Sequence, residues 1–342
     1  MSDNNKILSV SVAAYNVEST LREALDSFLA PEVLEQVEVL IVDDGSKDST
    51  AAIGREYQEQ YPGTFKLISK ENGGWGSTLN AAIEAASGRY FKQLDGDDYY
   101  SVENLPIFLK FLSESDADMI CTAFAIFEDE SGGVLSVESR IREFVGINQT
   151  LNLKELGTFM PAMHALTVKT KVLQDAKVRI TEHCFYTDLE FVVKAYNNCR
   201  TFAYMELPIY MYRIGRSGQS MSVEGIRKHY REHQKVLFTC LDYLNTEVTD
   251  VYKKAALTRR LEGACTMQYM FYYALECNSQ QKREFKEYDR TLMEKYPDFF
   301  EKTAGGSRLK ILRKTNFLFY KIFGRQNTEQ DRRNKKHIFE GN

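Results

Sequence analysis

Several features that mark specialised proteins are scarce or missing in this sequence. Six cysteines are spread over 342 residues, no two of them stand as a Cys-x-x-Cys pair, and no Cys/His spacing typical of zinc occurs. The formal net charge is only −4, from 44 basic and 48 acidic residues, which does not favour nucleic acid as a partner. These absences argue against a zinc module and against a general nucleic-acid-binding protein.

Long hydrophobic runs are also missing. A membrane-spanning helix needs about eighteen or more consecutive apolar residues, and no such stretch occurs. The first residues are polar and lead directly into a strand-like segment, so we expect no signal peptide. We expect the unpaired cysteines to be reduced core thiols of a cytosolic protein. The composition, 43% hydrophobic and 27% charged, is ordinary for a globular protein.

Strand-like and helix-like segments alternate through the first 127 residues. Short apolar or β-branched runs, typical of strands, occur at residues 7–14, 37–42, 65–69, 90–94 and 118–127, and helical periodicity lies between them. This alternation predicts an α/β fold with a mostly parallel sheet flanked by helices. In such sheets ligands bind beyond the carboxyl ends of the strands, and the acidic clusters of this chain stand at those ends.

The second half of the chain has a different pattern. Residues 187–197 have helical periodicity and residues 201–212 are strand-like, whereas residues 223–296 are helical throughout. We therefore predict a catalytic α/β domain over residues 1–222, a helical C-terminal region over 223–330 and a flexible tail over 331–342.

Three carboxylates within four residues form the strongest chemical signal, in Asp95-Gly96-Asp97-Asp98. Such carboxylates repel one another unless a cation or a network of donors holds them. Mg²⁺ and Mn²⁺ prefer oxygen ligands and often bridge one or two carboxylates to substrate phosphates. An acidic β-turn around the Asp-Gly pair is the alternative interpretation.

Two further motifs follow strands. Asp43-Asp44-Gly45-Ser46 offers carboxylates that can accept hydrogen bonds from a nucleobase imide or a ribose hydroxyl, or can simply form a turn and a helix cap. The glycine-rich segment 72–77 precedes a helix, and its glycines permit close approach of a ligand to backbone N–H groups. It lacks the GxxxxGK[ST] pattern of a P-loop.

Together and in this order, these motifs resemble the family-2 glycosyltransferases of the GT-A fold. The segments that carry the resemblance are Val10-Ser11-Val12-Ala13-Ala14-Tyr15-Asn16, Val42-Asp43-Asp44-Gly45-Ser46, Asn72-Gly73-Gly74, Ala86-Ser87-Gly88-Arg89-Tyr90 and Leu94-Asp95-Gly96-Asp97-Asp98. The resemblance is strong over residues 7–127 and looser to about residue 222. The chain departs from the family at Ala14, where proline is usual, and at Thr78-Leu79-Asn80, where many members carry Ala-Arg-Asn.

The resemblance implies a role for each matched residue in a UDP-sugar site. It implies that Asp44 binds the uracil imide, that Asp97 ligates a Mn²⁺ or Mg²⁺ ion bridging the diphosphate, and that Asp98 assists. Which of Asp97 and Asp98 is the main ligand stays open. The other residues implied to line the donor site are Ala13 and Tyr15 at the nucleobase, Gly74 in the glycine-rich loop, and Asp95 at the ribose or sugar.

Inverting transfer needs one carboxylate that removes the proton of the attacking acceptor hydroxyl. Family members carry this base in a Glu-Asp pair that opens a helix, and the equivalent here is Thr187-Asp188, with threonine in place of glutamate. We therefore predict Asp188 as the base, with Glu190 as the second choice. The alternative is that Asp188 is only an acidic residue in the first turn of a helix, where the helix dipole favours it.

Residues 210–220 resemble the family's loop that closes over the diphosphate. Arg213 and Arg216 would then neutralise the leaving group, unless this segment is simply a basic surface loop. His164 is a candidate for the acceptor side, although a lone histidine is more often structural.

The resemblance implies an inverting, metal-dependent transfer from a UDP-sugar to a saccharide or lipid-linked acceptor, in bacterial surface-polysaccharide or cell-wall glycan assembly. A sugar nucleotidyltransferase is one alternative, but Ala13-Ala14-Tyr15-Asn16 is not the glycine- and Lys/Arg-rich loop such an enzyme needs. A catalytically inactive nucleotide-sugar-binding module is another. The retained acidic residues, including Asp188, argue against it.

The segment 308–325 has six basic residues and no acidic ones. On a continuous helix, a basic stripe containing Lys310, Arg313, Lys314 and Lys321 would lie beside a wide apolar face. Such a helix suits the surface of an anionic membrane. The alternative is that the apolar face packs on the preceding helices, as amphipathic helices usually do.

Overall fold

The computed structural model describes residues 6–139, 149–216, 220–303 and 306–323. The chain divides into two compact units, Met1–Ser217 with Thr246–Leu257, and Gly218–Asn245 with Thr258–Asn342. The predicted domain boundaries at residues 222 and 330 stay predictions, and the predicted tail 331–342 lies outside the described residues. None of the described helices combines the length and the apolar character that crossing a bilayer requires.

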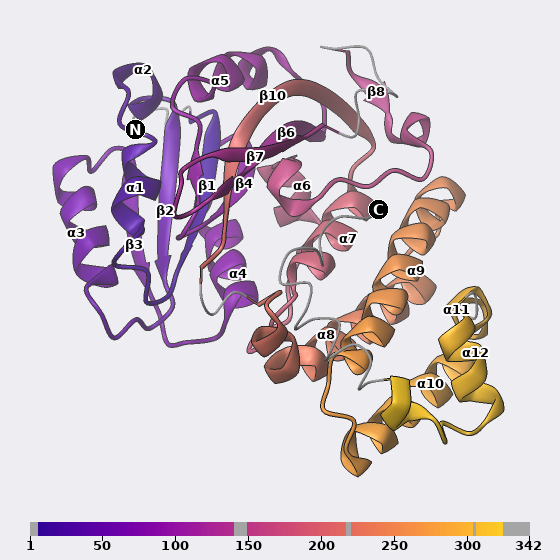
Figure 1. The fold of residues 1–342 in the computed structure, drawn as a ribbon. Coiled ribbons are helices and arrows are strands. Elements are labelled where there is room, and N and C mark those ends of the chain that lie inside the picture. Colours follow the sequence, from indigo (N-terminus) through magenta and orange to yellow (C-terminus); the bar gives the residue numbers. More distant parts are fainter. Residues whose placement is uncertain (1–5, 140–148, 217–219, 304–305, 324–342) are drawn as a thin grey trace. The chain divides into compact units, whose positions relative to one another are not determined.

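The first unit is built on a single sheet. Its strand order is β3-β2-β1-β4-β9-β6-β10-β5, with β7 paired to β6 and β8 paired to β10. Figure 1 shows the long β10 curving along the sheet. The strands are β1 Leu8–Ala14, β2 Val37–Asp43, β3 Phe65–Ser69, β4 Tyr90–Asp95, β5 Tyr99–Tyr100, β6 Met119–Glu128, β7 Val134–Glu138, β8 Leu151–Asn152, β9 Leu166–Lys169 and β10 Thr201–Ile214.

Most of the long strands run parallel, as predicted. The pairs β1–β2, β1–β4, β2–β3 and β6–β10 are parallel. Several shorter strands are antiparallel to their partners: β5 and β8 to β10, β7 to β6, and β9 to both β4 and β6, between which it lies. At only four residues, β9 is too short to give a clear strand signal in the sequence, and it makes the sheet mixed at its centre.

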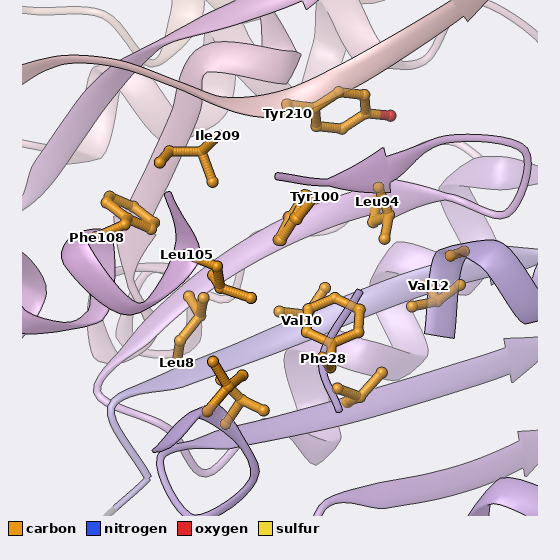
Figure 2. Packing of buried hydrophobic residues seen from close by; sticks show 14 of the residues in the cluster. Leu8, Val10, Val12, Phe28, Leu94, Tyr100, Leu105, Phe108, Ile209 and Tyr210 are labelled. Atoms are coloured by element: carbon orange, nitrogen blue, oxygen red, sulfur yellow. The ribbon is translucent and has the colours of Figure 1, made fainter. Parts of the chain in front are cut away.

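Helices and 3₁₀ turns complete the first unit. The alternating residues Leu8, Val10 and Val12 of β1 are fully buried and pack in one cluster with Phe28 and Phe108 (Figure 2). Burying one such side chain contributes roughly 1.5–3 kcal/mol. On the sheet, α4 contacts β1 and β2. The elements are α1 Leu21–Asp26, α2 Pro31–Leu34, α3 Thr50–Gln60, α4 Trp75–Ala85, α5 Leu105–Glu114, η1 Leu153–Leu156, η2 Met163–Ala165, α6 Thr170–Asp175 and α7 Asp188–Asn198.

The strand register explains how distant motifs come together. In β1, Ala14 pairs with Asp43 of β2 and Ala13 pairs with Asp95 of β4. Because these strands are parallel, their carboxyl ends meet at one edge of the sheet. Asp44 and the cluster that starts at Asp95 therefore leave the sheet on either side of the end of β1.

The second unit is helical, in agreement with the periodicity of the sequence. Its core is aromatic: the rings of Tyr272 and Phe285 stack with their centroids 4.6 Å apart, and Tyr320 packs edge-on against Phe285. A hydrogen bond of 2.6 Å joins the buried His233 and Gln268. The helices are α8 Val223–Thr246, α9 Val251–Tyr273, α10 Ser279–Lys295, α11 Pro297–Thr303 and α12 Ser307–Lys314, and the first residues of α9 belong to the first unit.

The continuous helix expected over residues 308–325 is not formed. Helix α12 ends at Lys314, because Asn316 and Phe317 have φ values of 49° and 62°, which an α-helix cannot contain. Arg313 is not part of a free basic stripe, since its Nε lies 2.9 Å from Asp289 and its guanidinium stacks 3.6 Å above the Phe300 ring. Residues 324 and 325 lie outside the described residues.

Candidate active site

Asp44 organises the glycine-rich loop that follows β3. Its carboxylate is buried and accepts hydrogen bonds from the backbone N–H groups of Gly73 at 2.9 Å and Gly74 at 2.8 Å. Lys70 Nζ donates to the same carboxylate at 2.8 Å, and the Ser77 hydroxyl donates at 3.2 Å. Three of these four donors use Oδ1, so Oδ2 keeps a free acceptor position. A nucleobase imide can occupy that position.

The loop packs tightly against the segment that leads to α7. A Cβ atom at Gly76 would lie 2.2 Å from the carbonyl oxygen of Thr181, so only glycine fits there. Asn80 holds the same segment from α4, because its side chain exchanges hydrogen bonds of 2.9 and 2.8 Å with the backbone of Ile180. Asn80 thus has a structural partner, whereas the arginine that many family members carry beside this position is Leu79 here.

The carboxylates of Asp95 and Asp98 are held by aromatic side chains. Trp75 Nε1 donates to Asp95 Oδ1 at 2.7 Å. Tyr210 donates its hydroxyl proton to Asp98 Oδ2 at 2.6 Å, and the backbone N–H of Arg213 donates to Asp98 Oδ1 at 2.7 Å. Both oxygens of Asp98 are therefore committed to fixing the end of β10 against the acidic turn.

Asp97 has a more open carboxylate. No other residue in the described part of the chain donates a hydrogen bond to it, and the nearby charges of Arg216 and Arg213 partly offset the rise that burial causes in its pKa. Burial, together with the charge of Asp97, raises the pKa of Asp95 to about 7 and that of Asp98 well above its usual range. This cluster is short of positive charge, and a divalent cation would relieve the repulsion.

His164 lies beside this cluster. One ligand atom each of Asp95, Asp98 and His164 lies within 4.8 Å of the other two. Both ring nitrogens of His164 are buried without a hydrogen-bond partner among the described residues, and burial lowers its pKa to about 3. A neutral imidazole with an unused nitrogen, together with carboxylate oxygens, is a donor set that suits Mn²⁺ and fits the predicted cation.

The buried Lys92 holds the backbone at His164 in place. Lys92 Nζ donates to the carbonyl oxygen of His164 at 2.7 Å and to that of Leu166 at 3.2 Å. These bonds fix the turn η2 that carries His164. Its ring also packs against Tyr210 and Tyr212, with centroid distances of 4.8 and 4.4 Å.

Asp188 opens α7 next to the same cluster. Its negative charge raises the pKa of Asp95 and of the Tyr212 hydroxyl, although burial is the larger cause in both cases. Its segment has two non-glycine residues with positive φ, His183 at 52° and Tyr186 at 63°, a backbone state that is often found at functional sites. The structure thus brings Asp188, predicted as the base, close to the acidic turn.

Glu190 has a different environment. It is buried, forms an ion pair of 2.7 Å with Lys194 and accepts a hydrogen bond of 2.9 Å from the backbone N–H of Thr181. These contacts tie α7 to the preceding segment and leave Glu190 little freedom to meet an acceptor.

The two arginines of the predicted diphosphate loop also differ. Arg213 is buried, and its guanidinium donates to the carbonyl oxygen of Asp97 at 2.7 Å, to Asp129 at 2.6 Å and to Glu23. It would have to exchange these partners to reach a diphosphate. Arg216 is more exposed, and it donates to Ser19 at 3.1 Å and lies 3.9 Å from Asp129. Arg216 is therefore the more available cation.

The residues predicted at the nucleobase lie at the end of β1. Ala13 is partly buried and pairs with Asp95, while Tyr15 is 47% exposed. Asn16 has a φ of 52°, so the chain turns away from the sheet directly after Tyr15. An exposed ring at this edge of the sheet is suited to stacking on a base.

Comparison with known proteins identifies a protein family that matches part of the chain. Residues 9–173 match the model of the family described as "Glycosyl transferase family 2". This region, just under half of the chain, therefore resembles glycosyltransferase family 2. The matched region contains Asp98 and all the predicted donor and metal residues that precede it in the sequence. Asp188, Arg213 and Arg216 lie beyond the matched region.

Two of the curated relatives are named for teichoic acid or poly(ribitol phosphate). The chain is 28% identical over 242 residues to the minor teichoic acid biosynthesis protein GgaB of Bacillus subtilis, covering 69% of this chain and 26% of that protein. It is 28% identical to the putative glycosyltransferase EpsH of B. subtilis, covering 60% of each. It is 25% identical to the poly(ribitol-phosphate) beta-N-acetylglucosaminyltransferase TarS of Staphylococcus aureus, covering 74% and 43%. The chain thus spans less than two thirds of these relatives.

Solved structures confirm the fold. A crystal structure of a TarS fragment in complex with UDP-GlcNAc superimposes with a TM-score of 0.64 at 21% identity, covering 97% of this chain and 93% of that one. A mannosyltransferase from Pyrobaculum calidifontis in complex with GDP-Man and Mn²⁺ gives a TM-score of 0.51 at 15% identity. The GT-A-like fold expected from the motifs is therefore correct.

Several residues at this candidate active site were not predicted from the sequence as site residues. Tyr210 and Tyr212 stand two residues apart in β10, and side chains two residues apart in a strand point to the same face. Strand periodicity could therefore have placed both rings on the same side. Lys70 and Lys92 gave no signal, because an isolated lysine in a strand-like segment looks like a solvent-facing residue. Their roles depend on contacts between segments far apart in the chain.

Proposed function

We propose that this chain transfers a sugar from a UDP-sugar to a hydroxyl group of a saccharide or lipid-linked acceptor, with inversion at the anomeric carbon. The observation that carries the proposal is the group of carboxylates at the carboxyl ends of β2 and β4, which flank the end of β1, with the charge of Asp188 close to Asp95. The family 2 match over residues 9–173 supports sugar transfer. The similarity to TarS, whose structure was solved in complex with UDP-GlcNAc, supports a uridine nucleotide as the carrier.

The proposed roles follow the geometry. Asp44, Ala13 and Tyr15 would hold the uracil, with Gly74 supplying the backbone curve beside it, and Asp95 would accept a hydrogen bond from the ribose or the sugar. Asp188 would remove the proton of the acceptor hydroxyl as that oxygen attacks the anomeric carbon and the diphosphate leaves. Arg216 would counter the charge that develops on the diphosphate.

We propose Mn²⁺ or Mg²⁺ as the cofactor. Asp97 would be its principal ligand, because its carboxylate is the least committed. Asp95 and His164, whose ligand atoms lie within 4.8 Å of each other, would complete the site. Both oxygens of Asp98 are already used, so Asp98 would act mainly by fixing the turn. Such a cation would neutralise part of the negative charge on the diphosphate and so make the diphosphate a better leaving group.

We propose surface-polysaccharide or cell-wall glycan assembly as the setting, with the enzyme acting at the inner face of the cell membrane. The names of GgaB and TarS, which refer to teichoic acid and poly(ribitol phosphate), support this setting. A phosphate-containing polymer is accordingly one acceptor worth testing alongside neutral saccharides.

A panel of nucleotide sugars tests the proposed function. The chain is incubated with UDP-, GDP- and dTDP-sugars in the presence of Mn²⁺, and nucleoside diphosphate release is measured with and without excess EDTA. We expect release from at least one UDP-sugar, and its loss in EDTA. Preference for a GDP- or dTDP-sugar would contradict the uridine assignment. Tight UDP binding without any release, with or without acceptors, would favour the inactive module.

A further inference from the structure

The outer surface of the last described segment is apolar and exposed. Within residues 307–323, Ile311 is 42% exposed, Leu318 is 69% exposed, Phe319 is 38% exposed and Ile322 is 54% exposed. Soluble surfaces tolerate single residues of this kind, but four large ones within twelve positions need an explanation.

The same segment has a second, inward side that anchors it to the second unit. Leu309, Leu312, Phe317 and Tyr320 are buried, and the Tyr320 hydroxyl donates to the carbonyl oxygen of Tyr272 at 2.9 Å. The core-packing alternative for this segment is therefore correct for the inward residues. It does not account for the exposed set, of which Ile311 lies on α12 and Leu318, Phe319 and Ile322 follow the break at Asn316 and Phe317.

Exposed lysines lie among the apolar side chains. On α12, Lys314 stands four residues after Lys310 and three after Ile311, so it lies beside both on the side opposite Leu309 and Leu312. Lys321, also exposed, stands next to Ile322. No acidic residue occurs between residues 302 and 323, so this surface has only positive charge.

We propose that the outward side of residues 307–323 binds the surface of an anionic lipid bilayer. The lysines Lys310, Lys314 and Lys321 would lie among the lipid headgroups, and the four apolar side chains would enter the boundary with the acyl chains. A second copy of the chain fits this surface poorly. A two-fold interface would bring the three lysines of both copies into one contact, without an acidic partner from this segment.

This inference names the residues of a membrane contact and does not depend on sugar transfer, because vesicle binding needs neither donor nor acceptor. It keeps the membrane hypothesis suggested by residues 308–325 but changes its residues. Arg313 leaves the basic set, since it is bound to Asp289 and stacked on Phe300. The apolar contact consists of Ile311, Leu318, Phe319 and Ile322.

The electrostatic part is tested with sedimented vesicles. We expect the chain to bind phosphatidylcholine vesicles that contain phosphatidylserine, to ignore pure phosphatidylcholine vesicles, and to bind less as salt rises. Changing Lys310, Lys314 and Lys321 together to glutamate should weaken binding by about a hundredfold, from roughly a fivefold loss for each basic residue. The matched control changes three exposed lysines elsewhere in the second unit to glutamate, Lys228, Lys235 and Lys295, and should bind nearly as the parent does.

The apolar part has its own variants. Leu318→Ser with Ile322→Ser should weaken vesicle binding while thermal unfolding stays unchanged, because both side chains are exposed. All six native cysteines are buried, so a fluorophore on Leu318→Cys reports this surface selectively, and its emission should shift to the blue on anionic vesicles. The proposal is overturned if the parent ignores anionic vesicles, or if the lysine variant binds as the control does. A dimer in solution that only the serine variant disrupts, with no vesicle binding, would also overturn it.

Discussion

Replacing Asp188 with asparagine is expected to abolish sugar transfer while leaving UDP binding nearly unchanged. A positioned general base contributes about 10²- to 10⁴-fold to a reaction rate, and asparagine keeps the shape of the side chain without its basicity. Since only the chemical step needs the carboxylate, kcat should fall within that range, whereas the dissociation constant of UDP should change by less than about threefold. Initial-rate kinetics and calorimetric titration with UDP measure the two quantities.

Glu190→Gln supplies the contrast for this prediction. Glu190 holds Lys194 and the backbone of Thr181, so its replacement should lower the free energy of unfolding. A collapse of UDP affinity in Asp188→Asn, with full turnover of the donor that still binds, would make Asp188 a donor-binding residue. Retained anomeric configuration in the product, read by NMR, would also contradict a single-base mechanism.

The second large effect concerns the cation. Asp97→Asn is expected to remove most Mn²⁺-dependent UDP binding and to reduce turnover to near background, because this open carboxylate is the one best placed to meet the metal. The fold should survive, since no other described residue donates a hydrogen bond to the Asp97 carboxylate. Titration of UDP with and without Mn²⁺ and a thermal melt of the unliganded chain measure these effects.

Asp98→Asn separates metal binding from support of the fold. Its carboxylate accepts from Tyr210 and from the backbone of Arg213. An amide cannot accept from both, and a buried donor left without a partner costs about 1–3 kcal/mol. We therefore expect a lower melting temperature in Asp98→Asn and an unchanged one in Asp97→Asn. Full activity of Asp97→Asn, or of the parent in excess chelator, would contradict the metal assignment.

The part of the candidate site that lies at the strand ends could be predicted from the sequence. Parallel strands with acidic carboxyl ends must bring Asp44 and Asp95 to one edge of the sheet, and the register of β1 between β2 and β4 confirms that arrangement. The position of Asp188 at the start of α7 also followed from helical periodicity. Local patterns are sufficient for these features.

What the sequence did not reveal depends on partners far apart in the chain. The ion pairs of the buried Arg213 involve Glu23 and Asp129, and the support of His164 by Lys92 spans 72 residues. The helical periodicity of the sequence also continues past Lys314. Asn316 and Phe317 are neither proline nor glycine, so neither of them marks the break in the helix. In that segment, packing of Phe317 and Tyr320 into the aromatic core outweighs the propensity of the chain to remain helical.

The most direct test of the central claim is a crystal structure of the chain with UDP and Mn²⁺. We expect the uracil between Tyr15 and Asp44, with the Mn²⁺ ion bridging the diphosphate to Asp97. We also expect the carboxylate of Asp188 to face the space beyond the β-phosphate, where the acceptor hydroxyl would arrive. UDP bound away from the ends of β1, β2 and β4, or a diphosphate held without any contact from the Asp95–Asp98 turn, would contradict it.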